Sequence, residues 1–226
     1  WLGYGLGAEA GLRADALALE VGGSEFTVRR GSELLGRVRL RLAGIHNVRN
    51  ALGAIAVGLE LGFDMATLAA ACATFPGVAR RFERRGERDG VLVVDDYAHH
   101  PTELVAVLAA ARQALPRRRL VAVFQPHLYS RTRDFADGFG AALTAADVAV
   151  VLPVYPAREQ PIDGIDAGLV VRAAARAGHR SVHAGPSVAE APAFLEGLLR
   201  EGDVLLTLGA GDVDRVGSAW LAGGAR

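Results

Sequence analysis

Alternation of apolar and polar residues marks one strand near the start of the chain. In residues 37–42 Val and Leu alternate with Arg, which indicates a strand with one buried and one solvated face. Together with the preceding EFTVRR and the turn GSELL, this strand predicts a β-hairpin. Residues 1–24 are rich in Gly and Ala and have only weak periodicity, and the β-like pattern begins at Glu25. Their GLGAEAG stretch follows no apolar strand, so it does not qualify as a dinucleotide-binding loop.

Helical periodicity follows the hairpin. One apolar stripe is formed by Val48, Ala51, Leu52, Ile55 and Leu59. This stripe predicts a helix that ends at Gly62, and a second helix is predicted from its N-cap Asp64 to about residue 73. FPG at 75–77 then breaks the pattern, and charge rises sharply over 80–88. We therefore expect a domain boundary between residues 1–79 and residues 80–226.

The rest of the chain alternates between buried strands and helices. Strands are predicted at 91–95, 119–124, 147–152, 181–184 and 203–209. Helices are predicted from Pro101, over about 133–143 and 167–177, from a capping box at Ser187 and Glu190 to about 200, and from about Asp212. Apolar strands separated by helices predict an α/β fold, with a parallel sheet that is covered on both faces.

Polar residues gather where these strands end. The segments are DDYAHHPTE (95–103), QPHLYSRT (125–132), PVYPAREQPIDG (153–164) and LGAGDV (208–213). In open α/β sheets, ligands bind outside the carboxyl ends of the strands. These loops therefore predict one cleft for an anionic or polar small molecule, but they do not define a reaction.

Several of these loop residues have a structural alternative. Asp95 and Asp96 suit either ribose hydroxyls or the capping of backbone amides, and His100 before a proline suits a helix cap. A cation at a helix start opposes the helix dipole, so one of Arg131 and Arg133 is expected to serve an anion. We expect Arg133 to be the solvent-exposed one.

Composition excludes several classes of protein. Basic and acidic residues balance at 25 each, and no apolar run is long enough to span a membrane, so neither a nucleic-acid nor a membrane partner is expected. Cys72 is the only cysteine, which excludes an internal disulfide. Every basic residue is Arg, which excludes a phosphate-loop lysine within these residues. Trp1 stands first without a signal-peptide pattern, which suggests a processed chain or part of a longer, cytoplasmic one.

The polar segments, together with GIHNVRNA and FPGVARRFE, resemble in order and spacing the Mur ligases, most closely the members that join L-alanine to UDP-N-acetylmuramate in peptidoglycan synthesis. The resemblance covers nearly the whole chain. It implies that residues 1–79 are the end of a central ATP-binding domain and that residues 80–226 are a C-terminal Rossmann-like domain. It also implies an acyl-phosphate intermediate made with ATP and Mg²⁺. The phosphate loop, the metal ligands and the UDP-sugar domain would then lie in missing segments, and this chain alone would be inactive.

The resemblance also implies a nucleotide site. His46, Asn47 and Asn50 would border the adenine, and a planar amide suits the edge of a base. Arg81 of the RRFE motif would contact the ATP phosphates, and Asp96 would accept hydrogen bonds from the ribose hydroxyls.

A substrate site is implied beside it. Tyr97, His99, His127 and Arg131 would face the amino acid and the acyl phosphate, with both histidines and the arginine as catalytic residues. An arginine fork suits a carboxylate or a phosphate, and a nearby histidine would accept the proton of the attacking ammonium. Leu128 stands where many relatives carry arginine, so no cation is carried over to that position.

Two other functions compete with the ligase. A stand-alone module that binds a nucleotide without catalysis would also keep these loops. A nicotinamide-dependent oxidoreductase would share the fold, but no G-x-G-x-x-G loop follows a predicted strand, which argues against it.

Overall fold

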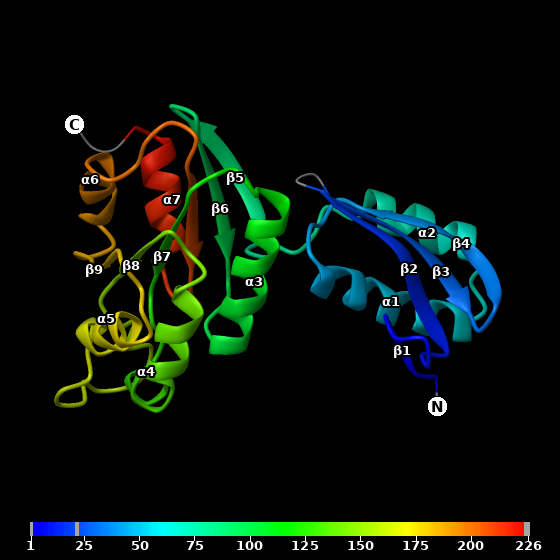
Figure 1. Cartoon of the computed structure of the whole chain (residues 1–226), viewed down its shortest axis with the longest axis horizontal. Coiled ribbons are helices and arrows are strands. Elements are labelled where there is room, and N and C mark those ends of the chain that lie inside the picture. The colour runs from blue at the N-terminus through cyan, green and yellow to red at the C-terminus, as the bar shows by residue number, and fades with distance from the viewer. Residues whose placement is uncertain (1, 21–22, 224–226) are drawn as a thin grey trace. The chain divides into compact units, whose positions relative to one another are not determined.

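The computed structural model describes residues 2–20 and 23–223. They form two compact units (Figure 1). The first runs to Gly77 and includes Ala110–Pro116, and the second comprises Val78–Ala109 and Arg117 onward. The assignment of the two parts of the chain to a central and a C-terminal ligase domain stays a prediction.

A four-stranded sheet forms the frame of the first unit. Its strands, in spatial order, are β1 (Tyr4–Gly5), β2 (Leu12–Glu20), β3 (Gly23–Arg30) and β4 (Glu33–Leu40). The pair β1 and β2 is parallel, and the others are antiparallel. The predicted hairpin, β3 with β4, is confirmed. Strand β2 lies where the sequence shows only weak periodicity, because its alternation is broken by a register shift between Asp15 and Ala18.

Two helices cover one face of this sheet. The apolar stripe of α1 (Ile45–Glu60) packs with sheet residues such as Phe26 and Val38 in one core, and α2 (Met65–Thr74) adds Leu68 to it. The backbone N–H of Thr67 donates to Asp64 Oδ1 over 2.7 Å, which confirms the predicted N-cap. The structure therefore agrees with the sequence for both helices.

A six-stranded sheet forms the second unit. Its strands are β5 (Glu83–Arg88), β6 (Val91–Asp96), β7 (Leu120–Phe124), β8 (Val148–Val151), β9 (Val182–Ala184) and β10 (Val204–Leu208), in the spatial order β5-β6-β10-β7-β8-β9. All neighbours are parallel except β5 with β6. Strand β5 is not predicted from the sequence, because its residues ERRGER are almost all charged. Charge of this kind is typical of an exposed edge strand but does not distinguish it from a loop.

Helices cover both faces of the larger sheet (Figure 1). They are α3 (Pro101–Ala114), α4 (Tyr129–Leu143), α5 (Ala167–Arg176), α6 (Ala191–Glu196) and α7 (Asp214–Leu221). Trp220 of α7 and Leu195 of α6 pack on the side of Val121 and Val123. The ring of Phe139 of α4 lies 5.0 Å from that of Phe124, whose side chain points to the opposite face. The predicted α/β fold is confirmed.

Two predicted helix boundaries are wrong. Helix α4 begins at Tyr129, because Leu128 O accepts from both the backbone N–H and the hydroxyl of buried Thr132. Helix α6 ends at Glu196 and not near residue 200. The Ser187 side chain does bond Glu190, but the pair forms a turn before the helix and does not open it. No helix among the described residues is long and apolar enough to cross a membrane.

Candidate active site

Four loops meet at the carboxyl edge of the larger sheet, as the sequence predicts. Strand β10 lies between β6 and β7, so the loops that follow all three are neighbours. Backbone hydrogen bonds join them: Gln125 N–H donates to Leu208 O over 2.9 Å, and Gly209 N–H donates to Asp96 O over 3.2 Å. The loop after β8 joins through an isolated bridge between His127 and Tyr155.

A row of rings crosses this edge. The centroids of Tyr97 and His99 lie 5.3 Å apart, and those of His99 and His127 lie 6.1 Å apart. Tyr155 then stacks on His127 at 5.6 Å and 14°. The structure therefore brings together the predicted Tyr97, His99 and His127. No role is predicted for Tyr155, since stacking between residues of distant loops leaves no local signal in the sequence.

Arg131 completes the row as a cation that feels the charge of Glu159 but forms no ion pair among the described residues. It lies half-buried in the first turn of α4, and its NH1 points at His127 Nδ1 over 3.4 Å. Within residues 2–20 and 23–223, no acidic side chain forms an ion pair with it. Arg133 is exposed and pairs with Asp134 over 2.8 Å, as expected for a solvated arginine. Arg131 is therefore the arginine that is open to an anion.

Arg80 holds the edge together, and the sequence does not single it out. Its guanidinium donates to Asp95 Oδ2 over 2.8 Å, to Gly209 O over 2.7 Å and to Gly211 O over 2.9 Å. It also lies over the Tyr97 ring at 5.1 Å. Because Asp95 is buried, Arg80 offsets the cost of its charge while it fixes the glycine loop.

Asp96 is buried and bonded within the chain. Its Oδ2 accepts from Phe82 N–H and its Oδ1 from Ala98 N–H, each over 2.8 Å. Burial raises the pKa of Asp96, while these amide bonds and the charge of exposed Arg81 oppose that rise. The capping of amides, the alternative to a ribose contact, is therefore present here. The contacts of Asp96 with ribose and of Arg81 with phosphates stay predictions.

Glu103 organises the start of α3. Its Oε2 accepts from the backbone N–H of His99 over 2.9 Å and from that of His100 over 3.1 Å. The His100 ring bonds Thr102, which fits the predicted helix cap. The sequence signal for Glu103 is its place three residues after the cap, as in a capping box.

The surroundings of the His127 ring favour its neutral form. Burial lowers the pKa of the His127 imidazole, and the positive charge of Arg131 lowers it further. The row therefore contains one histidine whose surroundings disfavour its charged form.

The three residues predicted to border adenine lie in the first unit. His46, Asn47 and Asn50 occupy the first turns of α1. Asn47 is buried, and its Nδ2 donates to Ala43 O over 2.8 Å, while Asn50 is exposed. Their contact with a nucleotide stays a prediction.

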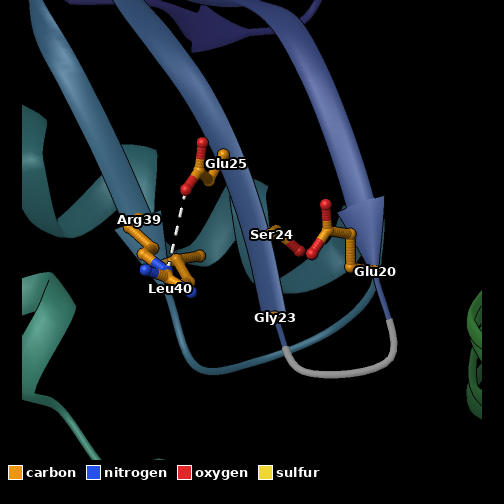
Figure 2. A pocket seen from close by; sticks show the side chains of 6 residues that line it. All are labelled: Glu20, Gly23, Ser24, Glu25, Arg39 and Leu40. Carbon is orange, nitrogen blue, oxygen red and sulfur yellow. Dashed lines mark ion pairs between the residues drawn. The ribbon is translucent and has the colours of Figure 1, made fainter.

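Two pockets differ in size and in the residues that line them. One of about 320 Å³ lies at the carboxyl edge, lined by Gln125, Tyr155 and Asp212 among others. The other, shown in Figure 2, holds about 50 Å³ between Glu20, Glu25 and Arg39 of the small sheet. A volume of that size admits a few waters only, and no predicted site residue lines it. Among the described residues, no three His, Cys, Asp or Glu side chains are placed to hold a metal ion.

Comparison with known proteins finds relatives that match nearly the whole chain. The sequence profile "Mur ligase, glutamate ligase domain" matches residues 80–211. The UDP-N-acetylmuramate–L-alanine ligase of Desulfatibacillum aliphaticivorans is 47% identical over 219 residues, which cover 97% of this chain and 48% of that protein. The corresponding ligase of Salinibacter ruber is 46% identical, over 96% of this chain and 46% of its own length. The chain thus spans about half the length of the curated relatives it matches.

Solved structures give the same result. The crystal structure of UDP-N-acetylmuramate-alanine ligase from Thermotoga maritima superposes with a TM-score of 0.80 at 26% identity, over 97% of this chain and 46% of that one. Folylpolyglutamate synthase from Mycobacterium tuberculosis shares the fold, with a TM-score of 0.73 at 22% identity over 96% of this chain and 49% of that one. The resemblance stated from the motifs is therefore confirmed, and the chain belongs to the Mur ligase family.

Proposed function

We propose that this chain supplies the C-terminal part of an ATP-dependent ligase that joins L-alanine to UDP-N-acetylmuramate in the cytoplasm, for peptidoglycan synthesis. The observation that carries the proposal is Arg131, a half-buried cation beside His99 and His127 that forms no ion pair within the part of the chain that the structure describes. The substrate is taken from relatives at 45–49% identity, which are UDP-N-acetylmuramate–L-alanine ligases.

The reaction makes an amide from a carboxylate and an amine. ATP converts the muramyl carboxylate to an acyl phosphate, and the amine of L-alanine then attacks the acyl carbon, so that phosphate leaves. Arg131 would bind the carboxylate of L-alanine or a phosphoryl oxygen through its two-pronged guanidinium. The Tyr97 and His99 rings would form the adjoining wall of the site.

The nucleotide and metal requirements are finer parts of the proposal. Asp96 and Arg81 are assigned to ATP, as are His46, Asn47 and Asn50. The described residues of this chain do not fit Mg²⁺, since they bring no three suitable ligands together. The Mg²⁺ ligands are therefore expected in a segment that this sequence does not contain, and no step is assigned to the ion here.

The test uses an extended enzyme, in which this chain is joined in frame to the preceding half of a curated relative. With ATP, Mg²⁺ and UDP-N-acetylmuramate, phosphate release should depend on L-alanine and be much slower with glycine or L-serine. The 226-residue chain alone should release no phosphate, because it has neither a lysine nor a G-x-x-x-x-G-K phosphate loop.

Two results would contradict the proposal. L-alanine-dependent ADP release by the chain alone would show that it needs no other phosphate-binding segment. Nucleotide binding by the extended enzyme without any amino-acid-dependent turnover would favour the alternative, a nucleotide-binding module.

A further inference from the structure

We propose that His99 and His127 hold opposite ring tautomers, so that His99 Nε2 accepts the proton of the attacking amine while His127 stays a neutral hydrogen-bond donor through its own Nε2. This inference rests on the proposed function for the identity of the amine. The tautomers themselves follow from the partners of each ring.

The partners of His99 place its proton on Nδ1. That nitrogen lies 2.9 Å from Tyr97 O, and a carbonyl oxygen can only accept a hydrogen bond. Glu103 Oε2, a second acceptor, lies 3.4 Å from the same nitrogen. A neutral ring with its proton on Nδ1 leaves the lone pair of Nε2 free to accept a proton.

Glu103 prepares His99 for that role in two ways. It holds the backbone of the His99–His100 segment through two amide hydrogen bonds, which sets the position of the ring. Its carboxylate also faces Nδ1 over 3.4 Å, so it favours the tautomer that carries its proton on Nδ1. Glu103 is therefore a positioning residue for the reaction.

The partners of His127 place its proton on Nε2. Its Nδ1 faces Arg131 NH1 over 3.4 Å, and a guanidinium can only donate. The groups that face the ring are Arg131 from α4, Tyr155 stacked on it, the His99 ring, and Glu159, whose charge acts in the opposite direction. Burial and Arg131 oppose a second proton, so His127 remains a donor that suits an anionic oxygen.

The resulting step balances. One N–H bond of the L-alanine ammonium breaks, its electron pair stays on nitrogen, and the proton goes to His99 Nε2. The free amine then forms a bond to the acyl carbon, and the acyl–oxygen bond to phosphate breaks with its electrons on the leaving oxygen. The second proton of the attacking nitrogen goes to the leaving phosphate, so that a neutral amide and hydrogen phosphate result. His99 releases its proton to solvent after each turnover.

The tautomers are tested in the 226-residue chain itself. Long-range ¹H–¹⁵N spectra at about pH 8.5, well above the usual imidazole pKa, show which ring nitrogen carries the proton. His99 should be protonated on Nδ1 and His127 on Nε2, with His99→Gln and His127→Gln used to assign the signals. His100 and His179 are internal controls, because each Nδ1 accepts from a backbone N–H and each ring should be protonated on Nε2.

Each spectrum has one expected and one contrary outcome. A proton on Nε2 of His99, or on Nδ1 of His127, would overturn the proposal. This outcome does not depend on the proposed ligase activity, since no substrate is present. Conversely, the tautomers could be as expected while the extended enzyme shows no L-alanine-dependent turnover. That result would reject the proposed function and leave the tautomer assignment intact.

The role of His99 as the catalytic base is tested in the extended enzyme. His99→Gln should lower kcat by about 10²- to 10⁴-fold at neutral pH, and the loss should shrink by about tenfold per pH unit, because alkali deprotonates the ammonium without the base. His127→Gln should also lose activity, but raising the pH should not restore it. Equal recovery in both variants, or none in His99→Gln, would overturn the assignment of His99 as the base, since a purely structural defect would not be relieved by alkali.

Discussion

At the scale of single residues, two arginines of the same helix show how position decides chemistry. Arg131 and Arg133 are two residues apart in α4, so their side chains leave the helix about 200° apart. Arg131 turns toward His127, and Arg133 pairs with Asp134 in solvent. Both lie near a helix start in the sequence, and their exposure in the structure agrees with the prediction that Arg133 is the solvated one.

We expect Arg131→Lys to damage the extended enzyme far more than Arg133→Lys. Lysine keeps the charge but loses the fork, and the loss of a charge-assisted pair in a protected site costs about 2 to 4 kcal/mol. This corresponds to a fall in kcat/KM for L-alanine of roughly 30- to 1000-fold. Steady-state kinetics with L-alanine varied at saturating ATP measure both variants. If Arg133→Lys were equally harmful, the substrate site would not lie at Arg131.

Arg80 shows what a residue-level interpretation misses. The resemblance points to its neighbour Arg81, which is exposed. The structure instead buries much of Arg80 against Asp95 and the carbonyls of Gly209 and Gly211. The two glycines are about 130 positions away along the chain, so no local pattern distinguishes the two arginines.

At the scale of elements, the close approach of α4 and α5 sets the position of the helix that carries Arg131. A Cβ atom on Gly140 of α4 would lie 2.5 Å from the backbone of Ala173 and Ala174 in α5. Real Cβ contacts are not that short, so the two helices touch through backbone at this point. Glycine weakens an isolated helix, so local helix propensity does not explain its presence at this position. The close contact between the two helices does.

We expect Gly140→Ala to destabilise the second unit by about 1 to 3 kcal/mol, because overpacking outweighs the gain of about 1 kcal/mol in helix propensity. Guanidinium unfolding of the chain gives the free energy. Gly138→Ala is the matched control on the same helix, since its Cβ would meet only the ring of Pro101, at 3.0 Å. Equal or greater stability for Gly140→Ala would show that α4 and α5 are farther apart.

At the scale of the whole molecule, each unit has a hydrophobic core. One core lies between the small sheet and its helices, and another lies between the large sheet and α6 and α7. The segment from Phe75 to Phe82 that follows α2 contains neither helix nor strand, and Phe75 and Val78 are exposed. A segment of this kind is accessible to proteases.

We expect limited proteolysis to cut first near residues 75–79, before the anchored Arg80, and to leave a resistant product that begins there and extends through α7. The second unit contains a complete set of strands and helices for its sheet, whereas the first exposes Val57, Leu61 and Phe63 and should be degraded sooner. Mass spectrometry of the products identifies the cut. A resistant first unit with a degraded second one would reverse this order of stability.

The sequence by itself determined the elements whose signal is local. These elements are the apolar stripe of α1, the cap of α2 and the buried strands β6, β7, β8 and β10, all of which the structure reproduces. The motifs also identified the family. The sequence did not reveal β2, whose period is broken by a bulge, or β5, whose charges indicate a loop as well as an edge strand.

Only the tertiary structure decided how the site is assembled. The insertion of β10 between β6 and β7, the stacking of Tyr155 on His127, and the bonds of Arg80 all join residues far apart along the chain. The tautomers of His99 and His127 likewise depend on which donor or acceptor faces each nitrogen. Periodicity and capping act over a few residues, whereas these contacts exist only after the sheet has brought its carboxyl ends together.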